Sequence, residues 1–292
     1  MKSFEYFVPH TLQEGLALLD NKGQKAKILA GGTDLIAQMR AERVQPTTII
    51  DIKKIPELNR LEWSADKTLH IGAAVPISKV VAFPHFTERF NILNQGCSVI
   101  GSTRIRNRAT IGGNICNAAP SADSIPPLLC LKARAVIAHD AGTRVIPLEQ
   151  FFCGPGETTL AHNELLVEIE IPASPTYSAG FYLRHTPREE MDIAVVGVAV
   201  FLVLAHGSQV CQQARIAVGA VAPTPIRVPQ AEVLLTGKNI SKEDIEKTAE
   251  KVAEAASPIS DIRSSAGYRK ELLKVLTRRT LKGACESLNI QI

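Results

Sequence analysis

Several motifs that mark common enzyme classes are absent from this sequence of 292 residues. It has no Gly-x-Gly-x-x-Gly turn, no Walker lysine loop and no Gly-x-Ser-x-Gly elbow, which argues against Rossmann dehydrogenases, P-loop NTPases and α/β-hydrolases. The seven histidines show no His-Glu-x-x-His or His-x-x-x-His spacing. The six cysteines are scattered singly, without the close pairs of zinc and iron–sulfur sites. We therefore predict neither a metal site nor a catalytic side chain in this chain.

Long apolar runs and a large excess of charge are also missing. The longest apolar run, residues 193–205, is shorter than the ~20 residues that a membrane helix needs, so we predict a buried strand without a membrane span. The net charge of +4, with lysine and arginine mostly spread out, does not indicate a nucleic-acid partner. The first residues lack the apolar core of a signal peptide, and together with the single cysteines this predicts a cytoplasmic protein.

Two glycine pairs stand out in what the sequence does contain. One lies in KILAGGTDL, residues 27–35, and the other in TIGGNICNAAPSAD, residues 110–123. Each pair stands between a strand-like and a helix-like run, and glycine lets backbone N–H groups approach phosphate or ring oxygens closely. Ser121 and Asp123 are typical of a helix N-cap and first turn, which favour anions. One pair alone is typical of a tight turn, but two predict an extended ligand held at two points, such as a dinucleotide cofactor.

The hydrophobic pattern predicts two domains that meet near residue 175, where residues 173–178 are typical of a linker. In the first domain, if residues 103–110 are extended, Arg104, Arg106 and Arg108 share one face, which suits an acidic partner, a cofactor phosphate or solvent. The predicted strands of this domain are residues 4–8, 26–30, 47–52, 68–74, 133–139, 143–147 and 164–172. Its predicted helices are one capped by Thr11 and Glu14, then residues 34–43, 75–83 and 88–99.

The second predicted domain has a different pattern. Residues 181–185, 193–205 and 210–221 are typical of three long antiparallel strands. Residues 241–256 and 268–288 carry apolar side chains at helical spacing. Strands followed by helices indicate an α+β domain.

These segments together resemble the FAD-binding medium subunit of the molybdenum hydroxylases, the family of xanthine dehydrogenase and carbon monoxide dehydrogenase flavoproteins. AGGTDL and TIGGNICNAAPSADS resemble its two FAD motifs, and residues 184–194 and 219–227 resemble its C-terminal domain. The resemblance implies an α+β fold. Residues 1–175 would form a FAD-binding domain of the vanillyl-alcohol-oxidase-like (PCMH) type with two α/β subdomains. Residues 176–292 would form a smaller α+β C-terminal domain, with a three-stranded antiparallel sheet plus helices.

The resemblance also implies which residues hold FAD. The first glycine segment would wrap the pyrophosphate with Ile28, Leu29, Ala30, Gly31, Gly32, Thr33, Asp34 and Leu35. The second would bind pyrophosphate and flavin with Thr110, Gly112, Gly113 and Asn114, and Asp123 would reach a polar edge of the cofactor. Ile100 would lie near the flavin ring, and Leu166 would contact the cofactor by its backbone. Asp34 and Asp123 equally suit the first turn of a helix.

Arg184 departs from the family pattern, because the family usually has a lysine there, close to the isoalloxazine. Either cation would stabilise negative charge on a reduced flavin. A guanidinium is planar and does not titrate usefully, so the flavin potential is expected to differ from that of relatives. A surface salt bridge is the alternative assignment for Arg184.

The function implied by the resemblance is that of an oxidoreductase subunit. It would pass electrons from the [2Fe–2S] clusters of a small partner subunit through FAD to an acceptor such as NAD. A large molybdopterin subunit would complete a heterotrimer, or a dimer of heterotrimers. Two alternatives stay open: a flavin-free scaffold of such a complex, and a stand-alone NAD(P)-dependent dehydrogenase, although the latter requires the missing Gly-x-Gly-x-x-Gly turn.

Overall fold

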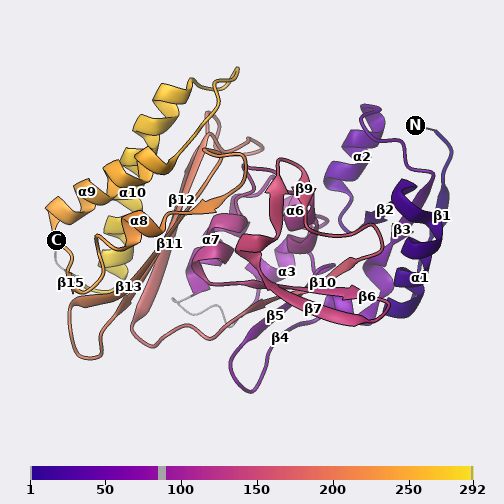
Figure 1. Cartoon of the computed structure of the whole chain (residues 1–292), viewed down its shortest axis with the longest axis horizontal. Coiled ribbons are helices and arrows are strands. Elements are labelled where there is room, and N and C mark those ends of the chain that lie inside the picture. The colour runs from indigo at the N-terminus through magenta and orange to yellow at the C-terminus, as the bar shows by residue number, and fades with distance from the viewer. Residues whose placement is uncertain (1, 85–89, 291) are drawn as a thin grey trace. The chain divides into compact units, whose positions relative to one another are not determined.

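A computed structural model describes residues 2–84, 90–290 and 292 (Figure 1). The chain forms two compact units, and neither is continuous in sequence. The first unit comprises Met1–Ala82, Thr103–Ala118 and Ala133–Ala173. The second comprises Phe83–Ser102, Ala119–Lys132 and Ser174–Ile292. The predicted boundary near residue 175 stays a prediction, because two earlier segments belong to the unit that holds the C-terminal part.

The N-terminal sheet of the first unit is parallel. Its strand order is β1 (Glu5–Phe7), β3 (Thr48–Asp51), β2 (Ala26–Leu29). The helix α1 (Leu12–Lys22) lies between β1 and β2 in the sequence. The Thr11 hydroxyl caps α1 by accepting from the Glu14 N–H, as predicted. The Glu14 carboxylate in turn accepts from the backbone N–H of His10. Leu16 and Leu19 of α1 join one apolar core with the strand residue Ile50, so the amphipathic pattern of the helix accounts for its packing.

A second sheet of the first unit is antiparallel, in the order β4-β5-β10-β6-β7. β6 and β7 correspond to the strands predicted at 133–139 and 143–147, and they pair as an antiparallel hairpin. The sequence reasoning missed the three-residue strand β4 and a two-stranded sheet of β8 and β9, because such short strands carry too little alternation to be detected. The strands are β4 (Leu61–Trp63), β5 (Leu69–Gly72), β6 (Arg134–His139), β7 (Gly142–Pro147), β8 (Phe152–Gly154), β9 (Glu157–Thr158) and β10 (Leu165–Ile171).

The arrangement considered for Arg104, Arg106 and Arg108 required an extended segment, and the structure does not have one there. Residues 103–110 are not extended, because α5 (Thr103–Arg106) begins the segment and the Asn107 N–H continues the turn by donating to the Thr103 carbonyl. Arg104, Arg106 and Arg108 therefore do not share the face of a strand. The backbone here forms a helical turn, closed by hydrogen bonds between residues four apart. The two-residue spacing of the arginines did not indicate this turn. The other helices of this unit are α2 (Thr33–Arg40), α3 (Ile77–Val81) and α6 (Ile111–Asn117).

The second unit contains the three long antiparallel strands that the sequence predicts: β11 (Ser178–His185), β12 (Val196–Leu204) and β13 (Val210–Gly219). Short strands β14 (Ile226–Arg227) and β15 (Lys238–Asn239) pair with β13. Its helices are α4 (Asn91–Ser98), α7 (Ile125–Cys130), α8 (Pro229–Glu232), α9 (Lys242–Ala255) and α10 (Ala266–Ser287). The first two residues of the helix predicted at 88–99 lie outside the described residues, and α4 corresponds to the rest of it.

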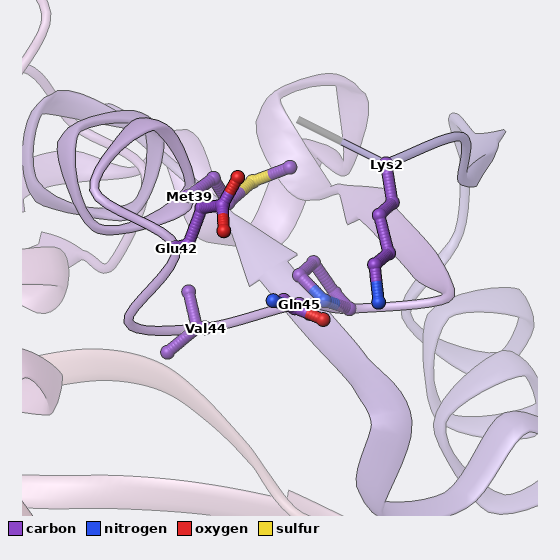
Figure 2. Close-up of a pocket in the computed structure, with 6 residues that line it drawn as sticks. Lys2, Met39, Glu42, Val44 and Gln45 are labelled. Atoms are coloured by element: carbon purple, nitrogen blue, oxygen red, sulfur yellow. The ribbon is translucent and has the colours of Figure 1, made fainter.

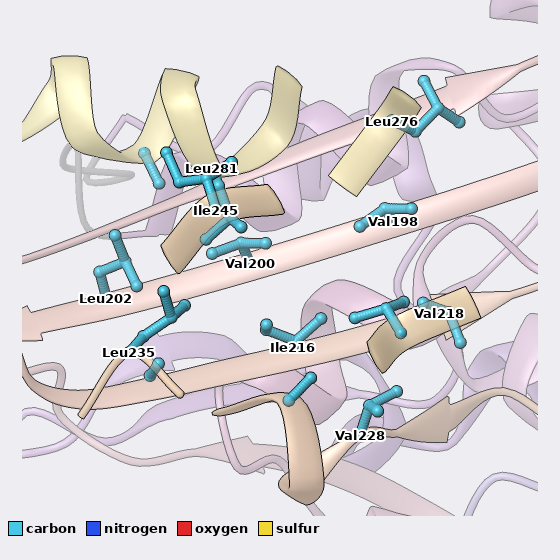
Figure 3. Packing of buried hydrophobic residues seen from close by; sticks show 14 of the residues in the cluster. Val198, Val200, Leu202, Ile216, Val218, Val228, Leu235, Ile245, Leu276 and Leu281 are labelled. Atoms are coloured by element: carbon cyan, nitrogen blue, oxygen red, sulfur yellow. The ribbon is translucent and has the colours of Figure 1, made fainter. Parts of the chain in front are cut away.

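The core of the second unit explains its long apolar run. Every residue of β12 is buried. Figure 3 shows Val198, Val200 and Leu202 of β12 in the same apolar cluster as Leu276 and Leu281 of α10, while the opposite face of the strand packs against α7. A strand covered on both faces needs continuous rather than alternating apolar residues. Among the described residues, no helix combines the length and the apolar character needed to cross a bilayer.

Candidate functional site

The first glycine segment connects β2 to α2 in the first unit. Gly32 is the N-cap residue of α2 and has φ +76°, a left-handed conformation that favours glycine. Gly31 has a different reason to lack a side chain. A Cβ at this position would lie 2.7 Å from the Cα of Ala109 and closer still to the Arg108 carbonyl oxygen. The segment is therefore packed, backbone to backbone, against the residues that lead into the second glycine pair.

The second glycine pair lies inside the first turn of α6 rather than in a loop before a helix. Thr110 is the N-cap residue, only 2% exposed, and its hydroxyl accepts from the Gly113 N–H at 2.9 Å. A Cβ on Gly112 would meet Ala73 at 2.6 Å, so Gly112 allows α6 to pack closely. A Cβ on Gly113 would meet only the Thr110 Oγ1 within 4 Å, at 3.0 Å, so the space beyond Gly113 is otherwise open.

The first unit thus brings the two predicted glycine segments together. Gly31 contacts the chain just before Thr110, and the side-chain amide of Gln38 in α2 donates to that of Asn117 in α6 at 3.3 Å. Both helix N-termini leave first-turn N–H groups without partners inside the helix, and the helix dipole favours anions there. The donors, the positive dipole ends and the open side of Gly113 fit the phosphates of a flavin nucleotide.

The other predicted residues of the first unit differ in what they can offer a ligand. Leu166 on β10 pairs with Ile137 and is almost fully buried, so only its backbone is available. Ile28 and Leu29 are half-buried. Asp34 is exposed in the first turn of α2, near the Thr33 hydroxyl at 3.4 Å, so its position also fits the dipole of that helix.

In the second unit, Asp123 does not lie in the first turn of a helix, and Ser121 is not an N-cap, although their residue types are typical of those positions. The helix α7 starts later, at Ile125, and Ser124 occupies its N-cap position without a side-chain hydrogen bond. Ser121 lies in the turn before it. The Asp123 side chain instead accepts a 2.6 Å hydrogen bond from Arg184 and a 2.7 Å hydrogen bond from the Tyr182 hydroxyl. The sequence could not indicate this arrangement, because the partners come from β11.

The resulting cluster of Asp123, Tyr182 and Arg184 is buried. The side chains of Asp123 and Arg184 are 8% and 7% exposed, so their ion pair is not the surface salt bridge considered for Arg184. Burial raises the pKa of Asp123, and the Arg184 guanidinium and the Tyr182 hydroxyl oppose this rise. Burial, together with the neighbouring carboxylate, raises the pKa of Tyr182 well above its ordinary value.

Tyr182 is a site residue that the sequence reasoning missed. It stands two positions before Arg184 on β11, so both side chains leave the same face of the strand. Gly197 on the neighbouring strand leaves room for the phenol, because a Cβ there would lie 2.6 Å from the Tyr182 oxygen. The Gln95 side chain accepts from the Tyr182 backbone N–H at 2.8 Å. Ile100, the other predicted residue of this unit, is half-buried after α4.

A small pocket of the first unit is not part of this site (Figure 2). It has a volume of about 10 Å³, close to the minimum that a single water molecule needs. None of the predicted cofactor residues lines it, and it is far too small for a flavin. Its lining residues are Lys2, Met39, Glu42, Val44, Gln45 and Pro46.

One group of side chains in the first unit has the composition of a metal site. The ligand atoms of His70, Glu168 and Glu170 lie within 4.8 Å of one another. However, Arg134 pairs with Glu170 at 2.8 Å, and Arg60 lies 3.8 Å from Glu168. Since each carboxylate already faces a guanidinium, this group is better described as a network of charges across neighbouring strands.

Comparison with known proteins identifies the family. Residues 2–174 match the family described as the FAD-binding domain in molybdopterin dehydrogenase. The chain belongs to this family. Residues 181–284 match the C-terminal domain of CO dehydrogenase flavoproteins. The predicted family and the predicted α+β fold, with a FAD-binding domain followed by a flavoprotein C-terminal domain, are therefore confirmed.

The relatives cover nearly the whole chain. A xanthine dehydrogenase FAD-binding subunit of Escherichia coli O157:H7 is 34% identical over 94% of this chain and 93% of its own length. The carbon monoxide dehydrogenase medium chain of Hydrogenophaga pseudoflava is 32% identical over 96% of both chains. A solved carbon monoxide dehydrogenase of that organism matches with a TM-score of 0.93 at 32% identity, covering 98% of each chain. Quinoline 2-oxidoreductase of Pseudomonas putida 86 matches with a TM-score of 0.91 at 31% identity, covering 99% of each.

The chain is accordingly an oxidoreductase subunit of the molybdenum hydroxylase type with a FAD-binding domain.

Proposed function

We propose that this chain is the FAD-carrying electron-transfer subunit of a molybdenum hydroxylase complex. It receives electrons from [2Fe–2S] clusters on a small subunit and passes them to an acceptor such as NAD. A large molybdopterin subunit completes a heterotrimer, or its dimer, in the cytoplasm. When bound, FAD supplies the one- and two-electron chemistry, and the chain binds, orients and electrostatically tunes it.

The observation that carries the proposal is the packing of the two glycine segments against each other in the first unit. Gly31 admits the backbone of residues 108–109, and Gly113 leaves open space at the start of α6. We assign residues 28–35 to the pyrophosphate. We assign Thr110, Gly112, Gly113 and Asn114 to pyrophosphate and flavin, and Leu166 to a backbone contact. The Thr110 hydroxyl contributes indirectly, since it holds the Gly113 N–H and fixes the first turn.

In the second unit we assign Asp123, Arg184 and Ile100 to the flavin. The Arg184 guanidinium is bonded to Asp123, so the charge of the cation is largely compensated. A compensated cation stabilises a reduced, anionic flavin less than an isolated one does. This pairing favours a lower flavin potential than a lysine without a carboxylate partner would give. Residues 1–175 and 176–292 are proposed as the two domains in sequence.

The test is the flavin content of the purified chain, measured by absorbance near 450 nm. Gly113→Leu is expected to fold but to lose FAD, because its side chain enters the space beyond Gly113. The control is Gly267→Leu, which is also a first-turn substitution, in α10, where a Cβ meets nothing within 4 Å. It should keep full FAD. A wild-type chain that is folded but colourless would instead indicate a flavin-free scaffold. Tight binding of NADH by a chain without FAD would indicate a stand-alone dehydrogenase.

A further inference from the structure

Tyr182 is the member of the buried cluster that the proposed function leaves without a role. Its phenol is 4% exposed, and its hydroxyl donates to Oδ1 of Asp123 at 2.7 Å. Arg184 donates to the other oxygen, Oδ2, at 2.6 Å. Each oxygen of the buried carboxylate therefore has a donor of its own, and the two donors come from one strand.

The backbone of Tyr182 is held from outside the sheet. β11 is the edge strand of the second unit, so every second N–H of this strand points away from β12. The N–H of Tyr182 is one of these, and it donates to the side-chain oxygen of Gln95 in α4 at 2.8 Å. A helix, rather than water, thus fixes the point of the strand from which the phenol starts.

The neighbouring strand leaves space for the hydroxyl. Gly197 of β12 is the direct cross-strand partner of Arg184. A Cβ at Gly197 would lie 2.6 Å from the Tyr182 oxygen, closer than van der Waals contact allows. A side chain at this position would therefore push the hydroxyl away from Asp123, so the hydrogen bond depends on bare backbone opposite Arg184.

Among the described residues, few other titratable groups face the Asp123 carboxylate. The Cys97 thiol of α4 is near it, but burial, together with this carboxylate, raises the pKa of Cys97 to about 12. Burial likewise raises the pKa of Cys130 in α7 to about 12, so both thiols stay neutral. The strand β12 carries no titratable side chain, and Arg215, the cation of β13, stacks on the Phe201 ring. Within the described part of the second unit, the charge of Asp123 is governed by its two hydrogen-bond donors.

The two donors oppose the effect of burial on Asp123. Burial raises the pKa of this carboxyl, and the Arg184 guanidinium and the Tyr182 hydroxyl lower it, because each stabilises the ionised form. A proton on Asp123 would leave Arg184 without its counter-charge. An uncompensated cation stabilises a reduced, anionic flavin more strongly than a compensated one. The Tyr182 hydroxyl can therefore act on the flavin without touching it.

We infer that Tyr182 is a positioning residue, which holds Asp123 ionised against Arg184 and thereby keeps the potential of bound FAD low. This inference rests on the proposed function, which assigns Asp123 and Arg184 to the flavin. Two electrons from the reductant and one proton from solvent enter FAD on reduction. With Tyr182 in place, Asp123 takes up no further proton. Without the hydroxyl, a second solvent proton binds the Asp123 carboxylate as the electrons enter.

The test measures the potential of the FAD-loaded chain against pH, by reduction with dithionite beside a redox dye of known potential. The potential of Tyr182→Phe should rise above that of the wild type as the pH falls. The ratio of reduced to oxidised flavin at a fixed potential should increase at least tenfold, which is about 30 mV for a two-electron couple. The two potentials should lie closest at high pH, where Asp123 is ionised in both chains.

Two further variants separate the hydroxyl from the ring. Gly197→Ala keeps the phenol but displaces its hydroxyl, so it should shift the potential in the same direction as Tyr182→Phe. Tyr177→Phe is the control, because it removes an exposed hydroxyl just before β11. It should have the wild-type potential at every pH.

A double variant tests whether Tyr182 acts through Asp123. Asp123→Asn has no carboxylate to ionise, so adding Tyr182→Phe to it should leave the potential unchanged. If Tyr182→Phe shifts the potential equally in both backgrounds, or by the same amount at every pH, the inference is overturned and the hydroxyl is only structural.

A second measurement needs no flavin. Carbon NMR of the aspartate carboxyls, with Asp123→Asn to assign the signal, follows the titration of Asp123 in the flavin-free chain. Asp123 should titrate at a higher pH in Tyr182→Phe than in the wild type, and an unchanged titration would contradict the role of Tyr182 alone. A folded wild-type chain that binds no FAD would instead contradict the proposed function.

Discussion

The hydroxyl of Tyr182 donates a 2.7 Å hydrogen bond to the carboxylate of Asp123, across 59 residues of sequence and inside the second unit. The other carboxylate oxygen is taken by Arg184. Asp123 belongs to the second glycine motif, whereas Tyr182 and Arg184 belong to β11. This relationship joins a predicted cofactor motif to the C-terminal sheet, and it fixes the orientation of Arg184.

Removing the Tyr182 hydroxyl should destabilise the second unit. In Tyr182→Phe the ring still packs beside Gly197, but the buried Asp123 loses one donor. Leaving a buried acceptor unsatisfied costs about 1–3 kcal/mol, so the free energy of unfolding measured with urea should fall by that amount. The control is Tyr177→Phe, at an exposed position whose ring contacts His206. An equal effect of both substitutions would mean that the hydroxyl of Tyr182 contributes nothing specific.

Breaking the ion pair from the other side should cost more. Arg184→Met leaves Asp123 as a buried charge without its cation, and such a change typically costs about 3–5 kcal/mol. The double variant Asp123→Asn/Arg184→Met should recover part of this loss, because no uncompensated charge remains. Urea unfolding of Arg184→Met, of Asp123→Asn and of the double variant gives the coupling energy between the two residues. Strict additivity of the two losses would contradict a direct interaction.

The sequence predicts an element well when residues close to one another in the chain determine it. The apolar run of β12, the Thr11 cap of α1 and the three long antiparallel strands of the second unit were all predictable. Residues 103–110 were not, because a short alternation of arginines gives no information on whether the backbone closes a helical turn. Helix propensity and strand alternation are both weak over so few residues.

The site was predictable as a set of segments but not as an arrangement. The glycine pairs are visible in sequence, yet the reason for Gly31 is the backbone at residues 108–109, which only the fold brings near. In the same way, Asp123 has a residue type that is typical of the first turn of a helix, but its partners come from a distant strand. Long-range partners of this kind decide between a first-turn acid and a buried ion pair, and no local pattern contains them.

The close packing at Gly31 gives a third prediction. A methyl group there would lie within 2.7 Å of the Ala109 Cα, so Gly31→Ala must displace one backbone segment from the other. Overpacking of this kind costs about 1–3 kcal/mol, and the FAD content should fall together with the stability. Gly267→Ala is the matched control, since a Cβ there meets open space. Thermal unfolding and flavin absorbance of both variants test this prediction, and a Gly31→Ala chain as stable as the control would contradict it.

The fourth prediction concerns the pH dependence of stability through Asp261. Backbone N–H donation from Arg263, with the hydrogen bond from Arg269, lowers the pKa of this carboxyl from 3.8 to about 2. A pKa that is lower in the folded state gives a stabilisation that is complete above pH 3.8 and is lost as the pH falls towards 2.

Asp261→Asn removes this titration. The melting temperature of the variant should therefore lie below that of the wild type at neutral pH, and the difference should shrink as the pH falls through 3.8. Calorimetric scans from neutral pH down to about pH 2.5 measure the difference. A gap of constant size over that range would mean that the hydrogen bonds of residue 261, rather than its charge, hold the loop, because an asparagine oxygen accepts from the same N–H groups without titrating.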